Sequence, residues 1–473
     1  NDCPGVRWCL RPMLHRSMGT LKLANSLAAL VRVFATSRLT LPVLLLLGAA
    51  VRLVWVFFSN RLTPLNSEMQ RVSAVLAETG VIADAYRLGS GPTTHVGPFA
   101  PWPGALAYRL FGVGTPAAEL VLTLMALAVI GATLLVLDRV FAALDEPPLA
   151  RRLAIAAFAL FPVFMGLEAQ DFRIRETAWS ALIVAALLLY MLRLEDRRDT
   201  RWRSLLALSL ISALLFLLSP SAGVVAYAAC GVFALRNLAI RRWPATAALA
   251  AAALFAVSLP WALRNQAVLG EMVWSRGNVG IELALGTNAA AVDPADPVRY
   301  FVDSMQRVHP AQSDTAYARM RDMGELAYSR MLADESWAWI RANPGDTARI
   351  WLRHVYEFYF APRWIWHPYG EQDRSDALRA AFVGATTALA FGALIWFLVI
   401  GRHRYFYVAA VVAASVVPFV MAQPRTRYRY VIAALLVFLA CAGVVRLLAR
   451  LGLSVAPKAA SPALHGGERP TTP

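Results

Sequence analysis

The sequence contains little charge of either sign and almost no lysine. Only 16% of its 473 residues are charged, and Lys22 and Lys458 are the only lysines among 46 basic residues. Soluble domains usually have about 25% charged and about 45–50% apolar residues, whereas 58% of this chain is hydrophobic. The apolar residues recur in runs along nearly the whole chain, as membrane-spanning helices do. The composition therefore argues against an ordinary soluble protein and favours a polytopic membrane bundle.

Several motifs of soluble enzymes are also missing. The four cysteines show no metal-binding spacing and imply no disulfide framework, because Cys230 and Cys441 fall in apolar runs and Cys3 and Cys9 in the N-terminal tail. No glycine-rich loop ends in Gly-Lys-Ser/Thr, which argues against a P-loop ATPase, and no His-Glu-x-x-His zinc motif is present. The absence of an Asp-x-Asp pair argues against a cytoplasmic site for a nucleotide sugar and its metal.

The hydrophobic runs predict about ten membrane spans, since each span needs about 20 apolar residues to cross the hydrocarbon core. The predicted spans are 39–58, 117–137, 152–167, 177–192, 204–219, 222–236, 244–262, 380–400, 405–421 and 430–448. The fifth and sixth are short and separated by Ser219-Pro220-Ser221. A hairpin and a broken, re-entrant pair remain alternatives at that point.

The short loops predict the orientation of the bundle, because cytoplasmic loops are rich in arginine and lysine. Arginines cluster after the fourth, sixth and eighth predicted spans, at Arg193, Arg197, Arg198, Arg201, Arg203, Arg236, Arg241, Arg242, Arg402 and Arg404. All three loops fall on one side, which we assign to the cytoplasm together with both termini. The net charge of +16 then reflects this rule, and we expect no nucleic-acid partner.

The spans and loops divide the chain into five predicted parts. These are a cytoplasmic N-terminal tail (1–38), a transmembrane module (39–262) with a first external loop (59–116), an external helical segment (263–379), C-terminal spans (380–450) and a disordered cytoplasmic tail (451–473). Met13 and Met18 are both plausible starts, so we treat residues 1–17 as non-native sequence.

Both external segments contain predicted helices. Residues 66–80, with Asn66 as the N-cap, and residues 101–112 predict short amphipathic helices that lie along the membrane surface. In the second segment, residues 313–342 predict a helix that ends at Asn343. Pro344 suits the first turn of the next helix.

Ionisable residues at the external ends of spans are the candidates for chemistry, because charge near the bilayer is costly. Glu68, at the entry to a surface helix, suits a general base, but spacing alone favours an acid that only complements the helix dipole. His95 lies in a proline-rich loop, where a phosphate or sugar ligand and a solvated histidine are equally good interpretations. The turn 168–176 carries five charges, and its arginines suit a phosphate, with a salt-bridged, solvated turn as the alternative.

A further pair of cationic stretches lies at the ends of two other spans. Arg264-Asn265 follows the seventh predicted span, and residues 425–429, with three arginines, precede the tenth. They suit the lining of a site for a lipid phosphate. Arginines that reach to the interface from helix ends are the simpler alternative.

Four ordered stretches resemble the bacterial membrane glycosyltransferases of the GT-C class, which include protein O-mannosyltransferases and lipid A aminoarabinose transferases. They are Glu68 to Gly80 with Gly91-Pro92-Thr93-Thr94-His95 and Leu110-Phe111-Gly112; Pro260 to Asn265 with Gly280 and Gly286-Thr287-Asn288; Tyr328 to Pro344; and Arg427-Tyr428-Arg429. No single stretch is specific, but their order agrees over most of residues 39–450. The resemblance implies an all-α GT-C fold of about ten transmembrane helices, with external amphipathic juxtamembrane helices and a larger external segment between spans 7 and 8.

The resemblance also implies a function. Such enzymes transfer a sugar, a hexose or a pentose, from a polyprenyl phosphate to a hydroxyl of a lipid, glycan or protein, usually with inversion. The site would face the periplasm from the bacterial inner membrane. A divalent cation is left open, since a few carboxylates can bind one or none.

The resemblance assigns roles to particular residues. An acid of the first external loop is the expected base, and many relatives have Asp-Glu where this chain has Ser67-Glu68, so Glu68 is the remaining candidate. Asp171 matches the acid of the family's second external loop, and Glu168 and Glu176 are further rivals. The residues assigned to the donor phosphate and sugar are His95, Arg173, Arg175, Glu176, Arg264, Asn265, Arg427 and Arg429.

A transporter or flippase of lipid-linked substrates is the alternative function. Its site would lie near the bilayer midplane, often between inverted repeats. Arg52 is the main charge within a predicted span, and no internal repeat is visible. A non-catalytic scaffold would not explain why acids and arginines gather on one face.

Overall fold

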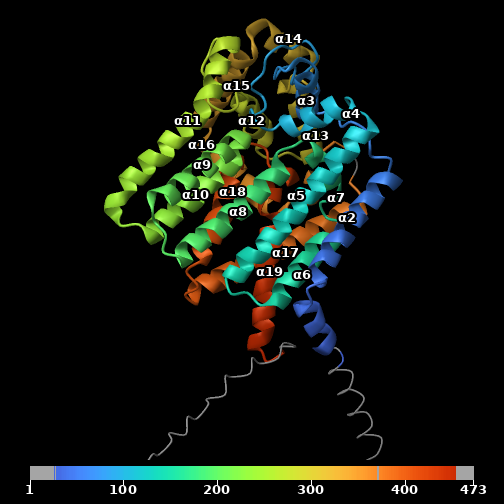
Figure 1. The fold of residues 1–473 in the computed structure, drawn as a ribbon. Helices are drawn as coiled ribbons and strands as arrows, with labels where there is room; N and C mark the ends of the chain where they lie inside the picture. The colour runs from blue at the N-terminus through green and yellow to red at the C-terminus, as the bar shows by residue number, and fades with distance from the viewer. Residues whose placement is uncertain (1–25, 27, 370–371, 454–473) are drawn as a thin grey trace, which may run out of the picture.

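The computed structural model describes residues 26, 28–369 and 372–453, whose helices form a long bundle with shorter helices over one end (Figure 1). The fold is 76% helical and has no strand among the described residues, which form only an isolated bridge between Ala83 and Pro92. The end of the bundle that carries the shorter helices is called the polar end. Cys3, Cys9, Met13, Met18, both lysines and the tail beyond residue 453 lie outside the described residues.

All ten predicted spans fall on helices. These are α2 (Thr40–Phe58), α5 (Pro116–Ala143), α6 (Pro148–Leu160) with α7 (Met165–Ala169), α8 (Thr177–Asp196), α9 (Trp202–Leu218), α10 (Pro220–Asn237), α11 (Trp243–Leu269), α17 (Arg374–Val399), α18 (Tyr405–Val416) and α19 (Thr426–Arg450). Among the described residues, six helices are long and apolar enough to cross a membrane: α2, α5, α8, α11, α17 and α19. A seventh would be the pair of α6 with α7, which is bent by 72°. The number of ten spans therefore stays a prediction.

Helices α9 and α10 form a hairpin, and whether each of them spans the membrane stays a prediction. Pro220 starts α10 directly after Ser219, and the two helices pack against each other. A Cβ added to Gly223 of α10 would lie 2.5 Å from Phe216 of α9. Farther from the turn, the Ser212 hydroxyl lies 3.5 Å from the Cys230 sulfur. Proline at the first position of a helix allows such a sharp restart.

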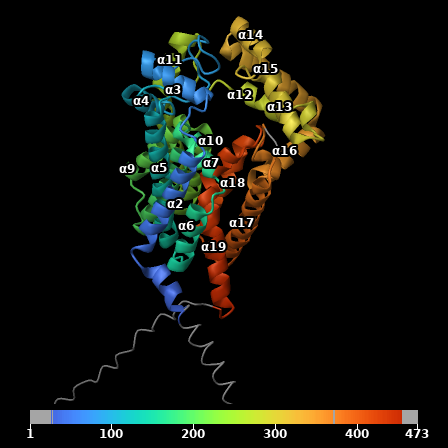
Figure 2. The same ribbon diagram turned by 90° about the vertical axis from the view of Figure 1, so that its right-hand side faces the viewer.

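The three arginine-rich loops meet at the end of the bundle opposite the polar end. Arg242 donates to the carbonyl oxygen of Thr200 at 2.7 Å, and Arg404 donates to Asp196 at 2.8 Å. Helix α2 begins and α19 ends at this same end (Figures 1 and 2). The three loops therefore share one end of the molecule, while its cytoplasmic location stays a prediction.

The long central helix α19 lies inside the bundle and packs against α5, α6, α8, α17 and α18. Small residues allow the close approach. A Cβ added to Gly443 would lie 2.5 Å from the Cβ of Ala393 on α17, and one added to Gly48 on α2 would lie 2.9 Å from the Cβ of Ala159 on α6. Helices in membranes commonly pack through such small residues.

The one mid-span charge noted in the sequence is neutralised inside the bundle. Arg52 lies 2.5 Å from Glu168, and both side chains are buried. Tyr430 donates a second hydrogen bond to Glu168 at 2.7 Å. Both contacts of Glu168 therefore stabilise the fold, and this residue is poorly placed to be the base.

Removal of Glu168 is expected to destabilise the bundle. Glu168→Ala leaves the Arg52 guanidinium buried without its counter-ion, and breaking a buried ion pair in this way costs about 3–5 kcal/mol. Thermal unfolding in detergent would measure the change, with Glu335→Ala as the control because Glu335 is exposed on the polar end. An unfolding temperature equal to that of the control would contradict this expectation.

Seven helices form the polar end. They are α3 (Glu68–Thr79), α4 (Trp102–Phe111), α12 (Val279–Gly286), α13 (Pro297–Val308), α14 (Asp314–Met323), α15 (Glu325–Ala342) and α16 (Pro344–Phe360). Figure 2 shows α3 and α4 over one side of the bundle and α13, α14 and α15 over the other. Helix α11 continues to Leu269 and α17 starts at Arg374, so helices cross the predicted boundaries at 262 and 379. The division into parts itself stays a prediction.

The structure corrects two expectations about these helices. Ser67, not Asn66, is the N-cap of α3, since its hydroxyl accepts from the backbone N–H of Gln70 at 3.3 Å. The single helix predicted over 313–342 is broken at Gly324, which has φ +89°. A residue without Cβ adopts such a conformation without strain, so the chain can turn there. The start of α16 at Pro344 is confirmed.

Candidate active site

The loop that carries His95 is held from both sides at the polar end. Glu325, at the start of α15, accepts from the Thr93 hydroxyl at 2.6 Å and from the Thr94 hydroxyl and backbone N–H at 2.8 Å. Arg264 donates to the carbonyl oxygens of Thr93 at 3.1 Å and Ile82 at 2.6 Å. These contacts tie the first polar segment to the second. The predicted phosphate-binding role of Arg264 stays a prediction, because the guanidinium contacts carbonyl groups here.

Glu68 is the first residue of α3, and its side chain is 17% exposed. Its oxygens face two different groups: Oε2 lies 3.9 Å from Arg175 Nη2, and Oε1 lies 4.0 Å from His309 Nε2. Burial alone would raise the pKa of Glu68, but the attraction of His309, Arg175 and His95 outweighs it and lowers the pKa to about 2. Glu68 is therefore a carboxylate at neutral pH.

Arg175 joins the two predicted catalytic acids. Its Nε donates to Asp171 Oδ1 at 2.8 Å, while its Nη2 faces Glu68. The other oxygen of Asp171 is buried and has no hydrogen-bond partner among the described residues. Because two carboxylates share one guanidinium, Arg175 is better placed to orient Glu68 than to bind a phosphate.

Two histidines and a tyrosine from both polar segments complete this cluster. The Tyr86 hydroxyl lies 3.2 Å from His95 Nδ1, and the His309 ring lies edge-on to both, at centroid distances of 6.0 Å and 5.8 Å. Burial lowers the pKa of His95 to about 3 and also lowers the pKa of His309. Both imidazoles are therefore neutral at neutral pH. Glu68, His95, Tyr86, Asp171, Arg175 and His309 are together called the Glu68 cluster.

Two arginines at the start of α19 have no carboxylate within ion-pair distance in the described part of the chain. Arg425 lies over the rings of Phe301 and Tyr369, at 4.6 Å and 5.6 Å from their centroids. Arg427 lies 4.9 Å from the centroid of the Tyr428 ring and donates to its hydroxyl at 3.0 Å. Burial lowers the pKa of Arg427, but the negative charge of Asp171 helps to raise it, so the two groups interact electrostatically without forming an ion pair. Both residues are partly exposed, and guanidinium groups suit an anion.

Four other predicted ligands make contacts inside the fold. The pairs are Arg173 with Glu119 at 3.1 Å, Asn265 with the Val273 carbonyl at 2.7 Å, Arg429 with Thr387 at 2.7 Å, and Glu176 with Arg276. The first three side chains are buried. Their predicted role as ligands stays a prediction, and these contacts give each a structural role.

Sequence reasoning did not select two residues that the structure brings to this site: Tyr86 and His309. Arg425 lies in the basic stretch 425–429 that the sequence predicted for a lipid phosphate, although it was not among the residues assigned to the donor. His309 and Tyr86 carry no local signal. Each lies in a polar segment among ordinary loop residues, and only the fold places them beside Glu68.

Only one group of side chains in the described ranges has metal-ligand spacing: His367, Asp373 and Asp376, whose candidate ligand atoms lie within 4.8 Å of one another. Asp373 and Asp376 form the capping box of α17, and Arg379 lies 3.0 Å from Asp376. These carboxylates are already used, so the group fits a metal poorly. In the Glu68 cluster, Arg175 supplies the positive charge between the two acids, and a divalent cation stays a prediction.

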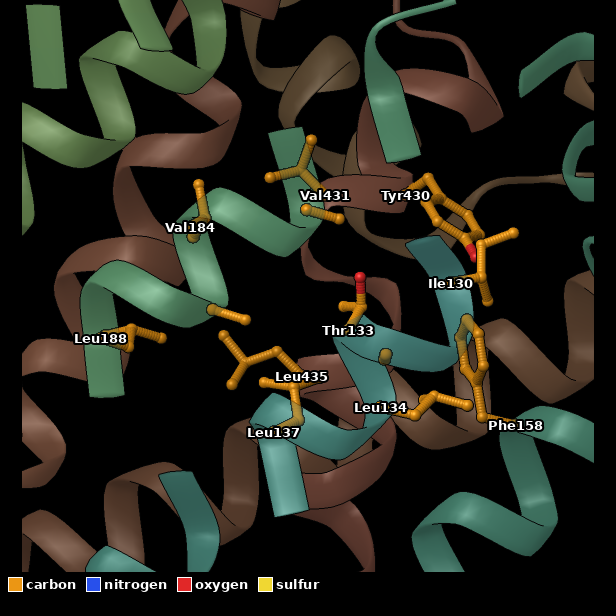
Figure 3. A pocket seen from close by; sticks show the side chains of 13 residues that line it. Ile130, Thr133, Leu134, Leu137, Phe158, Val184, Leu188, Tyr430, Val431 and Leu435 are labelled. Atoms are coloured by element: carbon orange, nitrogen blue, oxygen red, sulfur yellow. The ribbon is translucent and has the colours of Figure 1, made fainter. Parts of the chain in front are cut away.

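An apolar pocket lies apart from this chemistry, within the bundle between α5, α6, α8 and α19 (Figure 3). Its lining offers polar side-chain atoms only from Thr133 and Tyr430, and the Tyr430 hydroxyl already donates to Glu168. Charged or sugar-like groups would find no partners there. The polar end remains the better candidate for an active site.

Glu357 on α16 is expected to make stability depend on pH. Burial raises the pKa of this carboxyl from 4.5 to about 7, although Arg353 lowers it, and Glu357 Oε2 has no hydrogen-bond partner among the described residues. Because the folded-state pKa lies above the unfolded value, the stabilisation is complete below pH 4.5 and is lost as the pH rises to 7. Glu357→Gln should therefore nearly match the wild type at pH 4 and exceed it at pH 8 by at most about 3 kcal/mol.

Thermal unfolding of both proteins in detergent at the two pH values would test this expectation. An equal shift at both values would contradict it, since glutamine would then act through packing alone.

Comparisons with known proteins bear on the fold. Neither a protein-family model nor a curated protein matches the chain. The crystal structure of the Archaeoglobus fulgidus oligosaccharyltransferase in the apo form is similar, with a TM-score of 0.50 and 13% identity, over 89% of this chain and 53% of that chain. The chain thus spans about half the length of this enzyme. The structure of ArnT from Cupriavidus metallidurans bound to undecaprenyl phosphate matches with a TM-score of 0.34 and 16% identity, over 86% of this chain and 79% of that chain.

The second likeness is too weak to support an argument, and the first is informative about the fold alone. The similarity to the oligosaccharyltransferase extends over most of the chain, and the spans predicted from the hydrophobic runs fall on helices. The predicted fold is thereby confirmed: the chain is an all-α polytopic membrane protein with the GT-C fold.

Proposed function

We propose that this chain is a membrane glycosyltransferase that moves a sugar from a polyprenyl phosphate to an acceptor hydroxyl. The arrangement of charges at the polar end carries the proposal. An ionised carboxylate, Glu68, faces neutral imidazoles, while Arg425 and Arg427 nearby lack carboxylate partners in the described chain. A base beside an anion site is what such a transfer needs. The fold, shared with an oligosaccharyltransferase, supports the same class of reaction.

The transfer is a single displacement in which Glu68 accepts the proton of the acceptor hydroxyl. The hydroxyl oxygen forms a bond to the anomeric carbon of the sugar, and the bond from that carbon to the phosphate oxygen breaks. The electron pair of the broken bond leaves with the polyprenyl phosphate, whose new charge Arg427 and Arg425 stabilise. One displacement inverts the anomeric carbon.

The weak basicity of the Glu68 carboxylate affects the timing of the proton transfer. Any carboxylate is a much weaker base than the alkoxide that would form from the acceptor hydroxyl. The hydroxyl becomes acidic only as its oxygen bonds to the anomeric carbon, so the proton moves late. Closure of the site by both polar segments would exclude the water that competes for the donor.

The proposed site faces the periplasm from a bacterial inner membrane. It lies at the end of the bundle opposite the arginine-rich loops, and such loops usually face the cytoplasm. The acceptor is a hydroxyl of a lipid, glycan or protein, and the donor sugar is a hexose or a pentose. A transporter or flippase is less well supported, because the mid-span charge of Arg52 is already paired with Glu168.

The test is incubation of the purified chain with a panel of polyprenyl-phosphate sugars and candidate acceptors. We expect release of free polyprenyl phosphate together with a glycosylated acceptor for at least one sugar. If the intact donor moved across the vesicle membrane and no donor of the panel were cleaved, the result would favour the transporter and contradict the proposal.

A further inference from the structure

Glu68 and the imidazole that faces it make no direct hydrogen bond. His309 Nε2 lies 4.0 Å from Glu68 Oε1, which is too far for a direct hydrogen bond. The other carboxylate oxygen, Oε2, faces Arg175. Oε1 and His309 Nε2 therefore face each other as two polar atoms without a direct bond.

The fold determines which nitrogen of His309 carries the proton. The backbone N–H of Ala311 donates to His309 Nδ1 at 3.3 Å, so Nδ1 is an acceptor. Burial lowers the pKa of His309, so the neutral ring holds a single proton. That proton is on Nε2, the atom that faces Glu68. A flipped ring would place a carbon against the Ala311 N–H and lose this hydrogen bond.

The ring is also held in place by its neighbours. Tyr86 and His95 lie edge-on to it from the first polar segment, while His309 itself follows α13 in the second. The two facing atoms therefore come from different polar segments, with a carboxylate acceptor in the first and an imidazole donor in the second.

We propose that the acceptor hydroxyl binds between Glu68 Oε1 and His309 Nε2, an inference that rests on the proposed function. An oxygen about 2.8 Å from both atoms would see them at an angle of roughly 90°, close to that between the donor and lone-pair directions of a hydroxyl. The hydroxyl donates its proton to Glu68 and accepts from the N–H of His309. One lone pair remains free to attack the anomeric carbon.

This arrangement gives the two carboxylate oxygens of Glu68 different roles. Oε1 receives the proton from the hydroxyl, and Oε2 stays beside Arg175, which orients the carboxylate together with Asp171. His309 acts as a catalytic residue that contacts the acceptor and orients the oxygen of the acceptor hydroxyl. Its contribution should therefore appear in the use of the acceptor and not in the affinity for the donor.

Two substitutions of His309 separate the N–H donor from the bulk of the ring. His309→Gln places an amide N–H near the position of Nε2, whereas His309→Asn is too short to reach it. We expect His309→Asn to lower kcat/KM for the acceptor about 10-fold or more, the worth of a lost hydrogen bond. His309→Gln should recover part of this loss, and KM for the donor should be unchanged in both. His403→Asn is the matched control, because His403 is exposed at the opposite end of the bundle.

A second measurement does not depend on turnover. Nitrogen-15 NMR of the histidine side chains, assigned by the signal lost in His309→Gln, reports which ring nitrogen of His309 carries the proton. We expect protonation at Nε2 and a shift of this signal when an acceptor analogue is added. A proton on Nδ1 would overturn the inference even if no sugar in the panel is transferred.

The outcomes also distinguish the inference from the proposed function. If the wild type transfers sugar and His309→Asn uses the acceptor as well as the control does, the hydroxyl binds elsewhere and the proposed function stands. If the wild type transfers no sugar from any donor, the proposed function fails, and this site for the acceptor hydroxyl fails with it.

Discussion

We expect Glu68→Gln to lower the rate of sugar transfer by a factor on the order of 10²–10⁴, the usual contribution of a general base. Glutamine has the shape of glutamate but cannot take up the proton of the acceptor hydroxyl. The fold should persist, since Ser67 remains the N-cap of α3 and Arg175 keeps its contact with Asp171 at 2.8 Å. The measurement is release of polyprenyl phosphate by purified variant and wild type at equal concentrations.

Glu78→Gln is the matched control for this experiment. Glu78 lies on the same helix, but its side chain is exposed near the end of α3, so the same substitution should leave transfer unchanged. The variant Asp171→Asn tests which of the two predicted acids, Glu68 or Asp171, is the general base. Full activity of Glu68→Gln with loss of activity in Asp171→Asn would move the base to Asp171, whose second oxygen is buried without a partner in the described residues.

Arg427→Ala is expected to lower transfer by a factor on the order of 10²–10³, similar to the loss of one fixed donor from an anion-stabilising site. The donor concentration that gives half the maximal rate should also rise. Both effects follow because Arg427 has no carboxylate partner in the described chain and can make charge-assisted hydrogen bonds to the leaving phosphate. Initial rates over a range of donor concentrations would measure them.

The control for this variant is Arg450→Ala, an exposed arginine at the other end of the same helix. It should change neither the rate nor the donor dependence. Equal activity of Arg427→Ala and the control would exclude Arg427 from the phosphate site. If only KM for the donor rises, Arg427 binds the donor without stabilising the transition state.

The helices themselves were largely predictable from the chain. Long apolar runs such as 117–137 and 430–448 became α5 and α19, since hydrophobicity and helix propensity act over neighbouring residues. The two wrong predictions concern the exact residue at which a helix starts and the point at which a helix is broken. Asn66 and Ser67 are equally good N-caps in sequence, and Gly324 breaks a helix that the surrounding residues would otherwise continue.

The candidate site was predictable only in part. Glu68, His95, Asp171 and Arg175 were selected because charges at span ends are costly, and the structure brings these four together. The same argument selected Arg173 and Arg429, whose contacts lie in the interior of the fold. Position along the chain cannot separate these cases, because neighbouring residues on a helix point in different directions.

The scarcity of charge marked this chain as a membrane protein, but other features were decided at two different levels. The sequence by itself determined the helices, the one-sided arginine loops and a carboxylate at the entry to a surface helix, because these depend on residues close together in the chain. Only the tertiary structure decided that His309 faces Glu68, that Arg175 is shared between two acids, and that Arg425 and Arg427 have no carboxylate partner in the described chain. Those contacts join segments far apart in sequence, and their geometry is set by the packing of the bundle.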